Sequence, residues 1–159
     1  MRQKLIIGVI GAGNASAHGL EHAYQVGQLI AKKGAVLVCG GLGGVMEAAS
    51  RGCVEAGGDV LGILPGNSLG TANPYVTLPI VTAMGHARNV IIAQTARALV
   101  AIEGEYGTLS EIAIGLKLGK PVVQLGSWPQ LSTTPQAETP AQAIEMIFST
   151  IQEGGIDDG

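Results

Sequence analysis

Residues 5–16 read LIIGVIGAGNAS, a short apolar run that ends directly in a glycine-rich loop. The continuous apolar residues 5–10 predict a strand that is buried on both faces, because a half-exposed strand would alternate. A helix is predicted to follow at residues 18–33. The same order recurs at residues 35–44, AVLVCGGLGG, where an apolar strand at 35–39 runs into a second glycine loop.

Strands and helices continue to alternate along the rest of the chain. Strands are predicted at 60–64, 98–102 and 121–125, and helices at 45–56, 85–95, 109–118 and 140–152. Apolar strands separated by helices indicate a parallel sheet covered on both faces, and its crossovers are nearly always right-handed. We therefore expect an α/β fold, a three-layer, doubly wound, mostly parallel sheet with helices on both faces, of Rossmann-like type.

One domain accounts for the length of the chain. The 159 residues suit a single core, so we expect a Rossmann-like domain at residues 1–152 and a frayed acidic tail at 153–159. Residues 65–79 hold three prolines and predict a surface loop with at most one short strand. Residues 127–139 are polar and proline-rich, which indicates a functional or mobile loop.

Composition excludes several classes of protein. The 25 glycines show no G-X-Y period, so the chain is not collagen-like, and 47% hydrophobic residues exceed what disordered chains contain. The apolar runs fall short of the ~18 residues of a membrane helix. The net charge of −3 gives no reason to expect nucleic acid. Cys39 and Cys53 form neither a disulfide framework nor a zinc spacing, so a cytoplasmic protein with free thiols is expected.

The low charge also bears on assembly. Only 13% of the residues are charged, and residues 90–101, VIIAQTARALVA, are apolar over much of a predicted helix. A small domain with so little polar surface is expected to bury part of it against other copies of itself.

Three glycine-rich loops are predicted at the carboxyl ends of strands, where open α/β sheets bind ligands. These loops are residues 11–16, 40–44 and 104–108. Glycine lets an anion approach the backbone N–H groups, and each following helix presents its positive N-terminus. The loops favour a small anionic, nucleotide-like ligand. The expected binding residues are Gly11, Gly13, Asn14, Gly40, Gly41, Gly43, Gly44, Arg88, Gly104, Gly107 and Thr108.

The common nucleotide and metal motifs are absent or incomplete. Gly11-x-Gly13 is followed by Ser16 instead of a third glycine, and the strand that ends at Cys39 offers no acid for a ribose, so no dinucleotide is expected. No P-loop sequence is present. Residues 18–22, HGLEH, fit the H-x-x-E-H zinc-protease pattern but lack an evident third ligand, so no metal site is expected.

Arg88 and Glu111 are the most informative polar residues. Thr108-x-x-Glu111 is either a capping box at a helix start or a carboxylate that contacts a bound sugar or water. Arg88 lies among small and apolar residues, where a guanidinium needs an anionic partner. That partner is either a ligand phosphate or Glu111 itself.

Several segments resemble the LOG-type superfamily, once labelled lysine decarboxylases. Residues 40–46, GGLGGVM, resemble its GGGxxGLM segment, and residues 103–111, EGEYGTLSE, fall on its PGGxGTxxE motif. Arg88 falls on the arginine of its R-K pair. One implication is a phosphoribohydrolase that cleaves the N-glycosidic bond of nucleoside 5′-monophosphates, with Arg88 and Glu111 as its catalytic residues.

A closer resemblance, over residues 4–126, is to the molybdenum cofactor carrier proteins within that superfamily. Its further segments are 62–66 (GILPG), 79–82 (PIVT), 87–89 (ARN) and 120–126 (KPVVQLG). Glu103 and Glu105 replace the proline and a glycine of the LOG motif, and Asn89 replaces its lysine. These replacements favour a binding protein over a hydrolase.

The second resemblance implies a non-catalytic carrier. Its cargo would be the molybdenum cofactor, an anionic pterin with a phosphate, held at the glycine loops. The resemblance also implies a dimer or tetramer, with molybdoenzymes or cofactor-biosynthesis proteins as partners and no nucleic acid or membrane.

Overall fold

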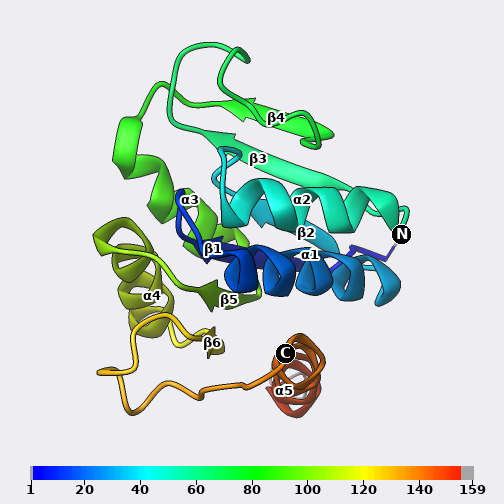
Figure 1. The fold of residues 1–159 in the computed structure, drawn as a ribbon, viewed down its shortest axis with the longest axis vertical. Helices are drawn as coiled ribbons and strands as arrows, with labels where there is room; N and C mark the ends of the chain where they lie inside the picture. The colour runs from blue at the N-terminus through cyan, green and yellow to red at the C-terminus, as the bar shows by residue number, and fades with distance from the viewer. Residues whose placement is uncertain (1, 155–159) are drawn as a thin grey trace.

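Six parallel strands form one sheet between two layers of helices (Figure 1). The structure, a computed structural model, describes residues 2–154. The strand order is β4-β3-β2-β1-β5-β6, with parallel pairing throughout, so the expected doubly wound α/β fold is confirmed. The strands are β1 (Ile6–Gly11), β2 (Val36–Cys39), β3 (Val60–Leu64), β4 (Leu78–Val81), β5 (Ala98–Ile102) and β6 (Val122–Leu125).

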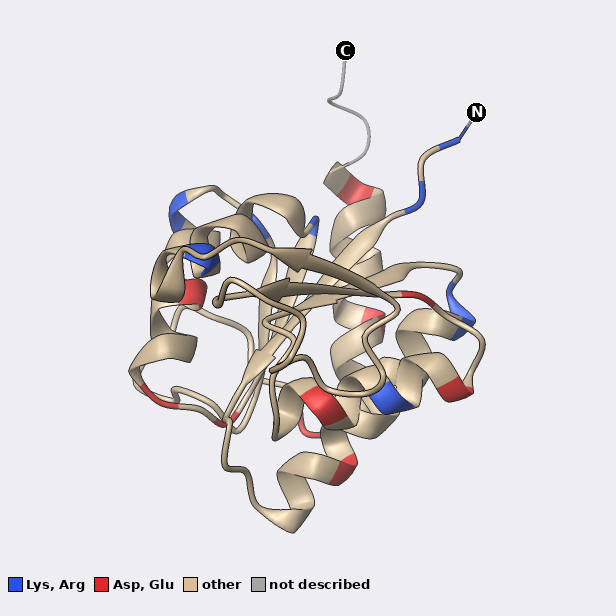
Figure 2. Ribbon diagram, turned by 90° about the horizontal axis from the view of Figure 1, so that it is seen from above, with Lys and Arg blue, Asp and Glu red and all other residues tan. Residues whose placement is uncertain are grey.

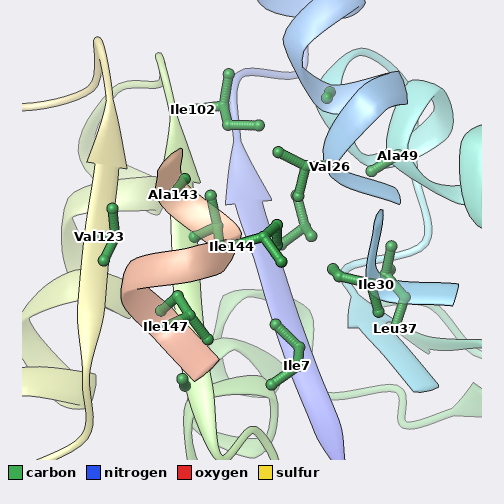
Figure 3. Packing of buried hydrophobic residues seen from close by; sticks show 14 of the residues in the cluster. Ile7, Val26, Ile30, Leu37, Ala49, Ile102, Val123, Ala143, Ile144 and Ile147 are labelled. Atoms are coloured by element: carbon green, nitrogen blue, oxygen red, sulfur yellow. The ribbon is translucent and has the colours of Figure 1, made fainter. Parts of the chain in front are cut away.

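Each face of the sheet has its own apolar core. Ile7 and Val9 of β1 belong to the core under α1 (Ala17–Lys32), α2 (Val45–Glu55) and α5 (Pro140–Gly154). Ile10 belongs to the opposite core, under α3 (Arg88–Thr95) and α4 (Tyr106–Lys117), because successive side chains of a strand point to opposite faces. Figure 3 shows Ile144 and Ile147 of α5 in the same core as Val26 and Ile30 of α1.

Helices α1 and α2 touch through glycines. A Cβ atom at Gly27 would lie 2.0 Å from the carbonyl oxygen of Ala49, and one at Gly52 would lie 2.0 Å from the carbonyl oxygen of Tyr24. Each helix therefore needs a residue without a side chain at this crossing, and the two backbones are in direct contact.

The strand order reverses next to β1. From β1 the chain adds β2, β3 and β4 on one side, then returns to place β5 and β6 on the other. Gly11 and Ile102, the last residues of β1 and β5, are register partners at this point. Open α/β sheets bind their ligands at the carboxyl ends of strands that flank such a reversal.

Several boundaries differ from the expected ones. Strand β4 extends beyond the loop expected at 65–79, and Pro79 is tolerated within it because β4 is an edge strand. The helix expected at 85–95 begins as a 3₁₀ turn, η1 (Gly85–Ala87), before α3. Helix α5 includes residues 153–154, and residues 155–159 of the expected tail lie outside the described residues.

The surface has few charges, as Figure 2 shows by the scattered blue and red segments on a mostly tan ribbon. The apolar stretch 90–101 does not form one exposed helix surface: Ile92 and Ala93 are buried in α3. Strand β5 is buried throughout, because an apolar core covers each of its faces. Its exposed apolar side chain is Val90. Homo-oligomerisation therefore stays a prediction. Within residues 2–154, no helix is long and apolar enough to cross a membrane.

Candidate functional site

A cavity of about 280 Å³ opens beside the reversal point, at the carboxyl ends of β1, β2 and β5. Loops after these strands, η1, α3 and the first turns of α4 form its wall. Seven expected binding residues line it: Gly11, Gly13, Asn14, Gly40, Arg88, Gly107 and Thr108. Four others do not: Gly41, Gly43, Gly44 and Gly104. The structure thus brings all three predicted loops together, with different roles for their glycines.

The glycines fall into two kinds. A Cβ atom at Gly13 or Gly107 would meet no atom within 4 Å, so these backbones border open space that a ligand can enter. Gly44 and Gly104 have φ values of +64° and +99°, which favour glycine. A Cβ at Gly104 would also lie 2.2 Å from Oγ1 of Thr108. Gly44 and Gly104 therefore shape the loops.

Arg88 is buried, and the protein backbone holds its guanidinium in place. Nε donates to the carbonyl of Ile63 at 2.8 Å and Nη2 to that of Gly40 at 3.3 Å, while Nη1 donates to Oδ1 of Asn89. Burial lowers the pKa of Arg88, and the nearby Glu111 carboxyl opposes this shift. An arginine remains charged under such conditions. The arrangement fixes a positive charge at the cavity wall.

Glu111 lies in the same wall and is 8% exposed. Burial raises the pKa of its carboxyl to about 8, although the positive charge of Arg88 acts in the opposite direction. Glu111 is therefore mostly protonated at neutral pH. A protonated carboxyl can donate a hydrogen bond into the cavity and does not repel an anion.

The capping-box interpretation of Thr108 and Glu111 is wrong. Helix α4 begins at Tyr106, with Glu105 at the N-cap and no capping side chain that accepts from its first N–H groups. The first helical bond runs from the N–H of Leu109 to the carbonyl of Glu105. Within the described part of the chain, the N–H groups of residues 106–108 have no acceptor. These donors remain free for a ligand.

The two acidic residues of the α4 loop point to different places. The Glu103 carboxylate accepts hydrogen bonds from the backbone N–H of Ser16 at 3.0 Å and from the Ser16 hydroxyl, at the start of α1. Glu103 has a φ of +53°, so the backbone leaves the extended conformation directly after the end of β5 at Ile102. Glu105 is exposed and lines the cavity. One of the two acidic side chains is thus removed from the site.

Sequence reasoning missed His86 and Asn89, which also line the cavity. Nδ2 of Asn89 donates to the carbonyl of Gly107 and to Oγ of Ser110, joining α3 to the start of α4. The position of Asn89 next to Arg88 in the sequence could have indicated that it belongs to the site.

The H-x-x-E-H pattern at residues 18–22 is a separate question. The His18 and His22 rings lie 4.0 Å apart, and no group of three or more potential metal ligands occurs within residues 2–154.

Together, the fold and the cavity define a Rossmann-like α/β protein with a cavity at the strand reversal that presents backbone N–H groups and a guanidinium. The chain belongs to the SLOG cluster4 family, whose profile matches residues 4–152. An uncharacterized protein of Archaeoglobus fulgidus is 47% identical over 144 residues, which cover 91% of this chain and 95% of that protein.

Two solved structures with high similarity are those of proteins named for the molybdenum cofactor. The molybdenum cofactor binding protein of Rippkaea orientalis is 40% identical, with a TM-score of 0.90, over 95% of this chain and 99% of that one. The molybdenum cofactor carrier protein of Chlamydomonas reinhardtii is 37% identical, with a TM-score of 0.88, over 94% and 99%. The expected family resemblance is confirmed.

The LOG-type relationship is more distant. A probable cytokinin riboside 5′-monophosphate phosphoribohydrolase of rice is 38% identical over 93 residues, 57% of this chain. The match spans 38% of the length of the rice protein.

Proposed function

We propose that this protein binds the molybdenum cofactor as a non-catalytic carrier, with the anionic end of the cofactor in the 280 Å³ cavity. One observation carries the proposal: the open backbone of Gly13 and Gly107, the free N–H groups at the start of α4 and the fixed guanidinium of Arg88 converge on one cavity. Two relatives, 40% and 37% identical, are named as a molybdenum cofactor binding protein and a molybdenum cofactor carrier protein.

The electrostatics of the cavity suit a phosphate. The positive end of α4 faces the cavity and adds to the charge of Arg88. Protonated Glu111 contributes no negative charge near neutral pH, and Glu103 is bonded to Ser16 instead. Glu105 is exposed, where water screens its charge. The buried guanidinium and the helix N-terminus therefore favour an anion in this cavity.

The carrier proposal is tested by titrating the purified protein with molybdenum cofactor released from a molybdoenzyme. We expect saturable binding, protection of the cofactor from oxidative loss, and a loss of affinity of about tenfold or more in Arg88→Ala, since charge-assisted bonds are the strong ones. Lys117→Ala, at an exposed cation at the far end of α4, is the control and leaves the affinity unchanged. Absence of saturable binding contradicts the proposal.

Glu111 supports a second candidate function. A buried carboxyl with a pKa of about 8 beside an arginine can act as a general acid toward a leaving base, so a nucleoside 5′-monophosphate phosphoribohydrolase is the alternative. The test is release of free base from a panel of nucleoside 5′-monophosphates. Release that is lost in Glu111→Gln supports catalysis, and absence of release contradicts it.

A further inference from the structure

A second, larger cavity adjoins the first. It measures about 540 Å³, is lined by the N-terminal turns of α1 and α2, and shares Gly13 and Asn14 with the first cavity. Cavities that hold small organic ligands usually measure ~300–1,000 Å³. The first cavity alone lies just below this range, whereas the second lies within it. A ligand whose anionic group occupies the first cavity can extend past Gly13 into the second.

The second cavity has a free acceptor on α2. Glu47 is half-buried and lines the cavity together with Arg51, one turn further along the helix. No hydrogen bond from the described part of the chain reaches the Glu47 carboxylate, whereas Glu21, in the same lining, accepts one from Nε2 of Gln25 at 2.8 Å. The Arg51 guanidinium lies over the ring of Tyr24, at 4.8 Å from its centroid. Among the described residues of this lining, Glu47 is therefore the carboxylate with both oxygens available to a ligand.

We propose that Glu47 recognises the 2-amino-4-oxopyrimidine edge of a pterin or guanine ring bound in the second cavity. That edge carries an amino group and a ring N–H side by side, and the two oxygens of a carboxylate accept from such a pair as they accept from arginine. Tyr75 adds an aromatic surface to the lining, which suits a flat ring. The inference rests on the proposed function, because it places the anionic group of the same ligand in the first cavity.

The recognition predicts a ranking among three probes. Guanosine 5′-monophosphate carries the full edge, inosine 5′-monophosphate lacks the amino group, and adenosine 5′-monophosphate lacks both donors. By isothermal titration calorimetry, we expect the guanosine nucleotide to bind about tenfold or more tightly than the inosine nucleotide, because a site built for a donor rejects a ligand that lacks it.

Glu47→Gln removes the charged acceptor and should weaken binding of the guanosine nucleotide most and of the inosine nucleotide, which keeps the ring N–H, less. The affinity for the adenosine nucleotide, which offers neither donor, stays unchanged and shows that the variant is folded. Glu21→Gln is the matched control and keeps the ranking. Equal binding of the guanosine and inosine nucleotides, equal losses of both in Glu47→Gln, or binding of none of the three overturns the inference. Equal binding that still depends on Arg88 leaves the anion site intact, and titration with molybdenum cofactor tests the carrier role separately.

Discussion

Arg88 and Glu111 line the same cavity, yet the hydrogen bonds of Arg88 go elsewhere: to the carbonyls of Ile63 and Gly40 and to Asn89. The pair interacts through space, and burial of Glu111 outweighs the attraction of Arg88, so the carboxyl stays mostly protonated near neutrality. The cavity wall thus presents a fixed cation and a neutral donor instead of a closed ion pair.

Stability should fall as pH rises through the titration of Glu111. Its pKa is raised from 4.5 to about 8 in the folded protein, so its stabilising contribution is full below pH 4.5 and is lost as pH rises toward 8. The slope is at most ~1.4 kcal/mol per pH unit. Urea unfolding of the wild type and Glu111→Gln at several pH values measures it. Parallel pH profiles for the two proteins would show that Glu111 titrates normally.

Arg88→Lys should weaken ligand binding although it keeps the charge. Lysine has one ammonium nitrogen in place of the planar guanidinium, whose Nε and Nη2 reach two separate carbonyls, so its charge would not be held in the same place. We expect an affinity loss of about tenfold and a destabilisation of ~1–3 kcal/mol from carbonyls that lose their partners. Calorimetry and urea unfolding give the two numbers. Wild-type affinity in Arg88→Lys would mean that charge alone suffices.

Gly13→Ala and Gly44→Ala should separate the two kinds of glycine. The first adds a Cβ to open space, so we expect wild-type stability and weaker ligand binding. The second forces alanine into a φ of +64° and places its Cβ 2.2 Å from the carbonyl of Ala12, so we expect a loss of more than ~1 kcal/mol. Thermal unfolding distinguishes them, and equal stabilities would contradict this division.

Ser16→Ala should destabilise the fold with little effect on ligand binding. The Ser16 hydroxyl caps α1 by accepting from the N–H of Gly19 at 3.0 Å and also donates to Glu103. Loss of a helix N-cap costs ~1 kcal/mol, and Glu103 loses one donor in addition. Chemical denaturation measures the loss. A large drop in ligand affinity would instead place Ser16 or Glu103 in the binding site.

The sequence sufficed for the order of elements, because buried parallel strands leave continuous apolar runs such as residues 98–102. It also located the three loops that meet at the cavity. The sequence did not predict features that depend on contacts between residues far apart in the chain or on packing within a loop. Gly104 has a positive φ and no Cβ, so the side chain of Thr108 can pack directly against its backbone. Helix α4 therefore begins at Tyr106, before Thr108, the expected N-cap. The direction of Glu103 depends on Ser16, 87 residues away in the chain.

The glycine contacts between α1 and α2 have a consequence for the cavity at the N-terminal ends of these helices. Gly27 and Gly52 bring backbone against backbone, so the separation of the helices is set by main-chain atoms that cannot change rotamer. The cavity is then pre-organised: its width exists before a ligand arrives, and little conformational entropy is lost on binding. For the proposed carrier function, a rigid cavity limits the rearrangement that the protein must undergo when it takes up or releases the cofactor.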